Sequence, residues 1–205
     1  MAGMSTSDVV APSAQLARAQ LAQAIAIKQQ MAEGRCAEQA VEVAQVMIWC
    51  LRSGGKVIFF GNGGSAQDAG HLAAELMGRF AFDRPGLAAF SLPDATAAMT
   101  AIGNDYSFED VFARQVEGLG AAGDIAFGIS TSGNSKNVLR AMEVAARKRM
   151  TTVGLSGRGG KLAAICDHCI CIPSEQTPRI QEAQILTGHI LCEIVERQLF
   201  SDEKA

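Results

Sequence analysis

KVIFFGNGGS, residues 56–65, is the part of the chain from which its architecture can be worked out. Valine, isoleucine and phenylalanine favour a strand, and the asparagine and glycines that follow favour a tight turn. Apolar residues fill the run without alternating with polar ones, which is typical of a strand buried on both faces of a parallel sheet. Residues 65–80 then have a helical composition, so the stretch predicts a strand, a turn and a helix in succession.

The same alternation of strand and helix continues along the chain. Four further apolar runs predict strands at 88–92, 124–130, 151–155 and 169–173. Helices are predicted at 13–28 and 36–51 before the first strand, and then at 94–102, 108–119, 137–149 and 179–200. This order predicts an α/β fold with a five-stranded parallel sheet flanked by helices, a flavodoxin-like sandwich with N-terminal helices. We expect residues 1–12 to form a flexible tail and residues 13–205 to form the single domain.

The composition argues against two classes of partner. The chain of 205 residues has a formal net charge of −3 and no cluster of lysine and arginine, so we expect no nucleic-acid partner. No apolar stretch approaches the roughly 20 residues that span a bilayer, so we expect no membrane segment. The N-terminal residues lack the basic and apolar regions of a secretory signal, which predicts a cytoplasmic protein.

Six cysteines raise the question of a metal site or disulfides. A cytoplasmic chain of this size needs no disulfides, and free cysteine is often buried. Cys166, Cys169 and Cys171 are close in sequence, but Cys169 and Cys171 alternate with isoleucines, which predicts two cysteines on one face of a strand. Their spacing also differs from the repeated C-x2-C of a zinc ribbon. His168 beside them is expected to be a surface histidine.

The turn at residues 61–65, called the glycine turn below, has the features of a ligand-binding loop. Glycines let the backbone approach a ligand, and Ser65 can cap the following helix. The free N–H groups at a helix N-terminus suit an anion. Ala66 stands where a dinucleotide fingerprint has its third glycine, and the turn lacks the lysine of a P-loop. A plain strand-to-helix turn is the alternative.

A second turn, residues 130–135 (STSGNS), follows the predicted strand 124–130 and is called the serine loop below. Its four hydroxyl side chains need hydrogen-bond partners, and a phosphate could satisfy them together with the helix N–H groups. A serine-rich capping loop is the alternative. Because ligands bind at the carboxyl ends of parallel strands, two such turns favour a phosphate site at that edge of the sheet.

Several dispersed blocks of sequence resemble a known family. They are GNGGSAQDAGH (61–71), AAELMGRF (73–80), AIGNDYSFEDVFARQV (101–116), GISTSGNSKNV (128–138) and RIQEAQILTGHILCEIVE (179–196). The serine loop resembles the signature of sugar isomerase (SIS) domains, and the chain from about residue 55 to 200 resembles the phosphoheptose isomerases of that family. The resemblance implies a homotetramer with active sites between subunits. It also implies conversion of sedoheptulose 7-phosphate to D-glycero-D-manno-heptose 7-phosphate, the first step of ADP- or GDP-heptose synthesis.

The resemblance also implies roles for particular residues. The sugar site would be lined by Asn62, Gly63, Gly64, Asn104 and Asp105. The phosphate would be held by Ser65, Ser130, Thr131, Ser132 and Ser135. Glu75 and His189 would transfer protons, and Gln181 would contact the substrate. In some members zinc is bound through residues matching His71, Glu75, Gln181 and His189, so zinc is the expected cofactor, one ion per subunit.

The chemistry of isomerisation suits these side chains. A proton moves between C1 and C2 of the sugar, which one carboxylate base such as Glu75 can perform. The protons on the two oxygens need a group that both donates and accepts near neutral pH, as the imidazole of His189 does. A structural alternative for His189 is a buried helix histidine. Fixed donors or a metal would stabilise the enediol intermediate.

Spacing adds three expectations. His71 and Glu75 are four residues apart on one predicted helix, where they could share a metal or form only a surface hydrogen bond. Gln181 and His189 are separated by about 12 Å along a helix that rises 1.5 Å per residue, so we expect one of them to come from a neighbouring subunit. Gln181 could instead be a solvated helix start. Arg79, four residues after Glu75, could pair with it or touch the substrate.

Two rival functions remain at this stage. A non-enzymatic SIS-domain regulator that binds a replication-initiator protein would keep the fold but lack residues matching Glu75 and His189, which this chain has. Another phosphosugar enzyme, such as an arabinose 5-phosphate isomerase or an N-acetylmuramic acid phosphate etherase, would resemble this chain only around the serine loop. Met47 and Trp49 are expected to pack in the core.

Overall fold

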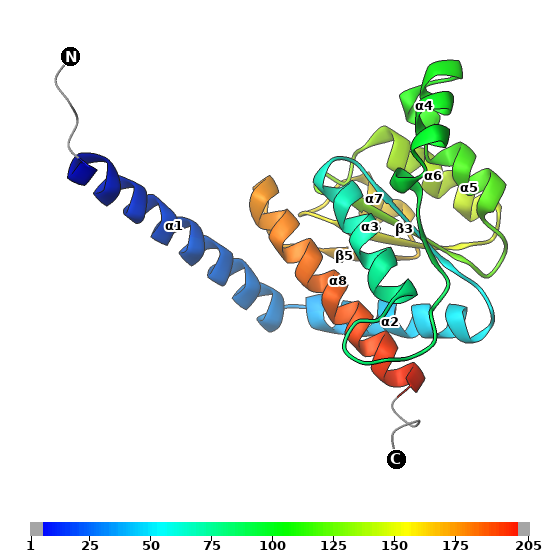
Figure 1. Ribbon diagram of the computed structural model, residues 1–205, viewed down its shortest axis with the longest axis horizontal. Coiled ribbons are helices and arrows are strands. Elements are labelled where there is room, and N and C mark those ends of the chain that lie inside the picture. Colours follow the sequence, from blue (N-terminus) through cyan, green and yellow to red (C-terminus); the bar gives the residue numbers. More distant parts are fainter. Residues whose placement is uncertain (1–5, 201–205) are drawn as a thin grey trace.

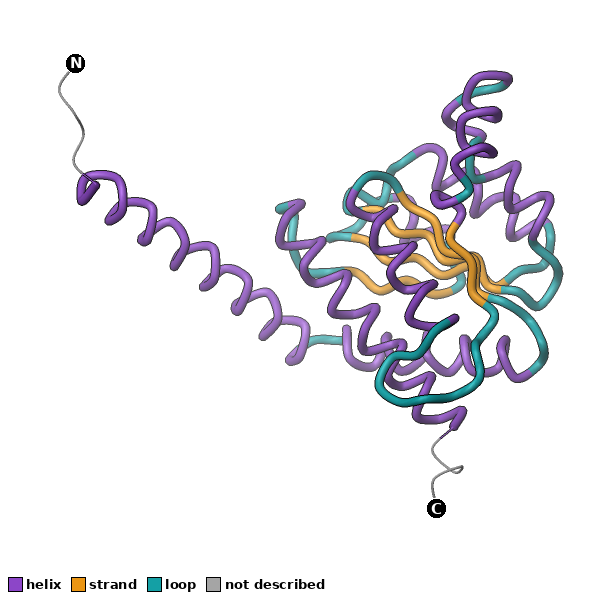
Figure 2. Tube along the Cα trace, viewed as in Figure 1, coloured by secondary structure: helices purple, strands orange, loops and turns teal. Residues whose placement is uncertain are grey.

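The computed structural model describes residues 6–200 and contains the predicted five-stranded parallel sheet (Figures 1 and 2). The strands are β1 (Val57–Gly61), β2 (Ala89–Ser91), β3 (Ile125–Ser130), β4 (Thr151–Ser156) and β5 (His168–Cys171). They lie in the order β2-β1-β3-β4-β5, and every neighbouring pair is parallel. The fold class predicted from the sequence is therefore confirmed.

Helices cover both faces of this sheet. The α-helices are α1 (Thr6–Glu33), α2 (Cys36–Arg52), α3 (Gly64–Met77), α4 (Thr96–Asp105), α5 (Ala113–Leu119), α6 (Lys136–Arg147), α7 (Lys161–Ile165) and α8 (Thr177–Phe200), with 3-10 turns η1 (Leu92–Asp94) and η2 (Phe108–Asp110). Phe59 packs in a core with residues of α2, α3 and α8, whereas Phe60 packs in a second core with residues of α5, α6 and α7. Successive residues of a strand enter opposite cores, which explains the uninterrupted apolar run.

The N-terminal helix differs from the sequence prediction. Helix α1 begins at Thr6 and passes through Pro12, so residues 6–12 are helical rather than a tail, and residues 1–5 lie outside the described part. It projects from the body of the protein (Figure 1), and Met31 near its end is the buried apolar residue among the side chains of α1 from residue 12 onward. A polar, alanine-rich helix of this kind gives little sequence signal for its start.

Two smaller expectations also need correction. The helix α7 has only five residues, too short for the periodicity by which helices are recognised, and it was not predicted. Met47 is buried as expected, with 1% of its surface exposed, but Trp49 is 67% exposed. Two positions apart on a helix point about 200° away from each other, so both residues could not face the same core.

The register brings the predicted ligand loops to one edge of the sheet. Gly61 at the end of β1 pairs with Ile129 of β3, and Ser130 pairs with Ser156 of β4. The glycine turn, the serine loop and the loop after β4 therefore all emerge at the same carboxyl edge. Within residues 6–200, no helix is both long and apolar enough to cross a membrane.

Candidate active site

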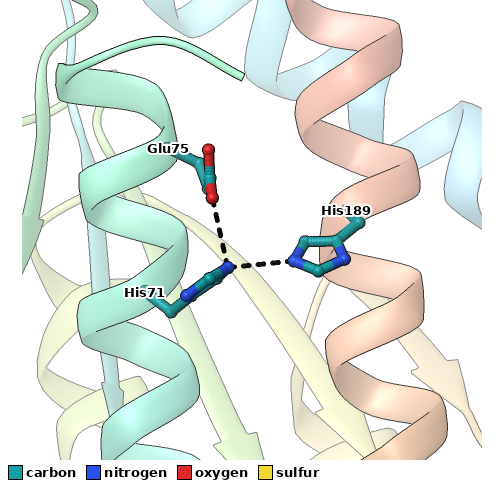
Figure 3. A group of neighbouring side chains, drawn as sticks. All are labelled: His71, Glu75 and His189. Carbon is teal, nitrogen blue, oxygen red and sulfur yellow. Dashed lines mark hydrogen bonds and ion pairs between the residues drawn. The ribbon is translucent and has the colours of Figure 1, made fainter. Parts of the chain in front are cut away.

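Helices α3 and α8 bring together two imidazoles and a carboxylate (Figure 3). His71 and Glu75 lie one turn apart on α3, and the Nε2 atom of His71 is 3.2 Å from Oε1 of Glu75. The same Nε2 atom lies 2.9 Å from Nε2 of His189 on α8, 118 residues later in the chain. One ligand atom from each residue lies within 4.8 Å of the others. Two histidines and a glutamate form a donor set typical of catalytic zinc sites, so these residues fit such an ion.

The close approach of α3 and α8 has a simple steric cause. Gly188, the neighbour of His189, faces the side chain of Leu72, the neighbour of His71, and a Cβ atom at position 188 would collide with it. The two helices can therefore pack tightly at this level. Gly188 and Leu72 thus fix the separation at which the two imidazoles face each other.

The glycine turn is held in a shape that only glycine adopts easily. Gly63 has φ +56° and ψ −121° and precedes the first residue of α3. The amide side chains of Asn62 and Asn137 exchange two hydrogen bonds of 2.8 and 2.9 Å, which ties this turn to the start of α6. Ser65 is buried in the first turn of α3. Asn137 was not identified from the sequence, where it resembles an ordinary polar residue of a helix start.

The hydroxyls of the serine loop contact one another. The Oγ atom of Ser130 lies 3.0 Å from that of Ser135 and 3.5 Å from that of Ser132, while Thr131 is half-buried beside them. Gly133 has φ +63°, and its backbone packs against Gly159 of the loop after β4. The backbone N–H of Asn134 donates to Oγ of Ser132.

Two helix N-termini open onto this edge without a side-chain cap. In the described chain, neither Gly63 before α3 nor Ser135 before α6 caps its helix through a side-chain hydrogen bond. The first N–H groups of a helix have no partner inside the helix, and its N-terminus carries a partial positive charge. At α3 the N–H groups of Ser65 and Ala66 donate to the oxygens of Asn62 and Gly63, and at α6 the Val138 N–H donates to the Asn137 side chain. The other N–H groups of each first turn can serve an anion placed at this edge.

The remaining predicted residues are not all part of this group. Gln181, in the first turns of α8, lies beside Gly64, since a Cβ atom there would collide with its Nε2 atom. It is therefore two helical turns away from His189, at the glycine turn. Asn104 and Asp105 lie exposed at the end of α4, where the amide of Asn104 donates a 2.8 Å hydrogen bond to the Asp105 carboxylate. Asp105 does not join the histidine–glutamate group of this chain.

Arg79 does not pair with Glu75, one of the two possibilities raised by its spacing. Its Nε atom lies 3.5 Å from the carboxylate of Asp83, and both side chains are exposed. The segment after α3 turns away from the helix axis, so the i,i+4 spacing from Glu75 does not place the guanidinium over the carboxylate.

A buried ion pair that was not predicted links the ends of α3 and α8. Glu196 on α8 accepts hydrogen bonds from the backbone N–H groups of Phe80 and Ala81 at 2.8 and 2.6 Å, and from Nε of Arg84 at 3.1 Å. Burial alone would raise the pKa of Glu196, but these two N–H donors and the Arg84 guanidinium outweigh it and lower the pKa. Arg84 also donates to the backbone oxygen of Glu75 at 2.8 Å. The ion pair therefore helps to fix the backbone of α3 at Glu75, one of the residues of the histidine–glutamate group.

Two hollows adjoin the predicted residues. One, of about 510 Å³, is lined by His71, Asp68 and Asp94 among others. The Oδ2 atom of Asp68 is buried there without a hydrogen-bond partner in the described chain, and burial raises the pKa of this carboxyl against the opposing effect of His71. A smaller hollow of about 210 Å³ lies beside Thr131, with Arg158 in its wall. The turn Gly157-Arg158-Gly159 at the end of a strand was the overlooked sequence signal for this cation.

Comparison with known proteins agrees with this architecture. Residues 21–157 match the SIS domain family, so the fold and the loops at its carboxyl edge are those of a SIS domain. The chain is 52% identical over 162 residues to a phosphoheptose isomerase of Sulfurimonas denitrificans, which covers 78% of this chain and 83% of that protein. It is 54% identical over 155 residues to phosphoheptose isomerase 2 of Campylobacter jejuni, covering 75% of this chain and 77% of the relative. At this similarity the chain belongs to the phosphoheptose isomerase family.

Solved structures support the same assignment. The phosphoheptose isomerase of Neisseria gonorrhoeae superposes with a TM-score of 0.83 at 44% identity, covering 88% of this chain and 97% of that one. The phosphoheptose isomerase of Francisella tularensis gives a TM-score of 0.87 at 35% identity, covering 90% of this chain and 98% of that one.

Proposed function

We propose that the protein is a ketose–aldose isomerase that converts sedoheptulose 7-phosphate to D-glycero-D-manno-heptose 7-phosphate, the first step of ADP- or GDP-heptose synthesis. The relatives are named phosphoheptose isomerases, which supports a phosphorylated seven-carbon sugar as substrate. The observation that carries the proposal is the meeting of Glu75 and His189 from separate helices. A sugar phosphate of this kind is charged and does not cross a bilayer unaided, so we place the reaction in the cytoplasm.

The phosphate is proposed to bind at the carboxyl edge of the sheet. There the N-terminus of α6 and the hydroxyls of Ser130, Thr131, Ser132 and Ser135 can donate to its oxygens, with Ser65 at the start of α3. The contacts among these hydroxyls support this role, because each hydroxyl that donates to a neighbour can turn instead to a phosphate oxygen. Arg158 in the adjoining hollow would add a positive charge.

The sugar is proposed to lie between this edge and the histidine–glutamate group. Asn62, Gly63 and Gly64 would contact it from the glycine turn, with Gln181 beside them. The Glu75 carboxylate would move the proton between C1 and C2, and the His189 imidazole would move the protons of the two oxygens. Asp68, with an unpartnered buried oxygen in the hollow beside His71, would accept a hydrogen bond from a sugar hydroxyl.

Zinc is the proposed cofactor. His71, Glu75 and His189 would hold it, and Gln181 would be a fourth ligand only if it came from another subunit or moved from the glycine turn. A bound zinc ion would polarise the oxygens of the substrate as a Lewis acid.

A homotetramer with active sites between subunits is also proposed. Helix α1 exposes apolar side chains such as Leu21 and Ile25, each 65% exposed, and a hollow of about 340 Å³ between α1, α2 and α8 is lined by apolar residues. Exposed apolar surface of this extent is typical of an interface. Asn104 and Asp105 lie on α4, none of whose residues is buried, so this helix is free to reach the site of a neighbour.

The test is an assay of the purified protein with sedoheptulose 7-phosphate, with and without a chelator. Glu75→Gln and His189→Ala should each lower kcat by about 10²- to 10⁴-fold, as expected when a general acid or base is removed. His168→Ala, a change of the same kind on strand β5, should leave the rate unchanged. Wild-type turnover by both active-site variants would refute the assigned roles. A zinc-supplied parent that is inert would refute the isomerase itself.

A further inference from the structure

Outside the proposed active site, a pair of sulfur atoms lies close together on the edge strand β5. The Sγ atoms of Cys169 and Cys171 are 3.8 Å apart. The side chain between them, Ile170, is buried in the opposite core, so both cysteines face the α7 side of the sheet, as the alternating pattern predicted. A Cβ atom at Gly154 on β4 would lie 2.9 Å from Sγ of Cys169, so the missing side chain leaves the space in which this sulfur packs.

The two thiols differ in their surroundings. Cys171 lies near the Cys169 thiol, the backbone N–H of Gly159, and the Ser156 hydroxyl, whose Oγ is 3.7 Å from its sulfur and also donates to the Gly157 oxygen at 2.9 Å. The hydrogen bonds from Cys169, Ser156 and Gly159 lower the pKa of Cys171 to about 6 against the opposing effect of burial. The same hydrogen bond, burial and the charge of Cys171 raise the pKa of Cys169. Of the two thiols, Cys171 is therefore the one that gives up its proton more readily.

The other cysteines do not combine a neighbouring sulfur atom with hydrogen bonds that lower the pKa. Burial is the main cause that raises the pKa of Cys36, raises that of Cys50 to about 11, and raises those of Cys166 and Cys192 to about 12. Thiolates react with oxidants and thiols hardly do, so oxidation should select Cys171. Within residues 6–200, the group of three side chains spaced to share a metal ion is His71, Glu75 and His189. The cysteines of β5 do not belong to such a group in this range.

We propose that Cys169 and Cys171 form an oxidation site that reacts with a small peroxide and closes to a disulfide. The Cys171 thiolate attacks one peroxide oxygen, which gives a sulfenic acid and releases the other oxygen as hydroxide. That hydroxide takes up the proton that Cys171 had lost to solvent and becomes the first water. The sulfur of Cys169 then attacks the Cys171 sulfur, the S–O bond of the sulfenic acid breaks, and its hydroxyl leaves with the Cys169 proton as the second water. Two thiols and one hydrogen peroxide thus give one disulfide and two waters.

The backbone permits this closure. Residues two apart on a strand have Cα atoms about 6.6 Å apart, at the upper end of the range that disulfides span. Strand β5 is at the edge of the sheet and pairs only with β4 in the described chain. On its other side the Cys169 and Cys171 oxygens accept hydrogen bonds from the Gln39 and Cys36 side chains of α2, so closure requires these two side-chain contacts to adjust and breaks no second ladder. A bond at this limit is strained and is therefore easily reduced again by cellular thiols.

Oxidation should also affect the serine loop. The segment after β4 supports it directly: in the loop, Gly157 N–H donates to the Thr131 oxygen at 3.1 Å, and in α7, Leu162 N–H donates to the Gly133 oxygen at 2.9 Å. Disulfide formation removes the Cys171 thiolate as an acceptor for Gly159 in this loop. We therefore expect weaker phosphate binding in the oxidised protein, a consequence that rests on the proposed function of the serine loop.

The oxidation site is tested on the full-length, reduced protein with hydrogen peroxide. After alkylation and trypsin digestion, mass spectrometry of peptide 162–179 should show an unalkylated Cys169–Cys171 disulfide and an alkylated Cys166. Cys169→Ser and Cys171→Ser should abolish the disulfide, and Cys166→Ser, the matched control in the same peptide, should retain it. Full alkylation of the wild type at every peroxide dose, or a disulfide that includes Cys166, would overturn the proposal.

The coupling is tested separately with inorganic phosphate as the probe in calorimetric titration. Oxidation should raise its Kd about two- to tenfold, the effect of one lost hydrogen bond, and dithiothreitol should restore it. Cys171→Ser should bind equally before and after peroxide. If the reduced protein binds no phosphate, the proposed function of the serine loop is wrong while the disulfide result stands. Equal binding by both forms of the wild type would refute the coupling alone.

Discussion

Glu196→Gln is expected to destabilise the protein far more than its single changed atom suggests. The side chains of Glu196 and Arg84 are 0% and 1% exposed, so the glutamine variant leaves an arginine charge buried without a counter-charge. Removing one partner of such a pair costs about 3–5 kcal/mol of unfolding free energy. For a domain of this size, that corresponds to a fall in Tm of about 6–20 °C. One of the N–H groups of Phe80 and Ala81 also loses its carboxylate acceptor.

The assay is thermal unfolding at equal protein concentration, because assembly also contributes to stability. The matched control is Glu193→Gln, one turn earlier on α8, where Glu193 forms an exposed pair with Arg197. This control should change the free energy of unfolding by no more than about 0.5 kcal/mol. A Glu196→Gln protein as stable as the control would refute the reasoning.

Acid adds an independent check on the same residue. Because the folded-state pKa of Glu196 is lowered, its charged form stabilises the fold above the unfolded pKa, and this contribution is lost as pH falls through the folded pKa. The difference in Tm between wild type and Glu196→Gln should therefore have its maximum value at neutral pH. It should shrink as pH falls below 4.5, the ordinary value for this group. A difference that does not change with pH would contradict the assignment.

Three further substitutions test other parts of the structure. Gly188→Ala should push α8 away from Leu72 and lower the free energy of unfolding by about 1–3 kcal/mol. It should also weaken the proposed zinc binding in a chelator competition, and an unchanged zinc affinity would refute the steric argument. Asn137→Ala removes both hydrogen bonds to Asn62, so the free energy of unfolding should fall by about 1–3 kcal/mol and the KM for the substrate should rise. A wild-type KM would show that the glycine turn keeps its shape without these two hydrogen bonds. Leu21→Glu on the exposed face of α1 should dissociate the proposed tetramer in light scattering. A variant with the same mass in solution as the wild type would exclude that face from the interface.

The fold was predictable because the central strands β1, β3 and β4 are buried on both faces. In KVIFFG each apolar residue enters one of two cores, so the strand and the layers above and below it follow from the sequence. Helix boundaries were harder to predict. The start of α1 and the short α7 depend on local hydrogen bonding that leaves no apolar periodicity. The exposure of Trp49 follows from its helical spacing from the buried Met47, which the expectation of both residues in the core left out of account.

The candidate site was predictable where its residues share one local element. The spacing of His71 and Glu75 predicted their contact, whereas their meeting with His189 was implied only by resemblance to a family. The partners of Arg84 and Asn137 lie 112 and 75 residues away, a separation over which sequence spacing has no predictive value.

Helix α8 carries Gln181 at the glycine turn, His189 opposite His71, and Glu196 beneath the segment after α3. During synthesis this helix leaves the ribosome after every strand of the sheet has already been made. A nascent chain can therefore assemble its sheet and expose both ligand loops while it still lacks the second imidazole. Cleavage between β5 and α8 followed by release of the last helix would return the mature protein to that state, so the proposed zinc binding would report chains in which α8 has docked.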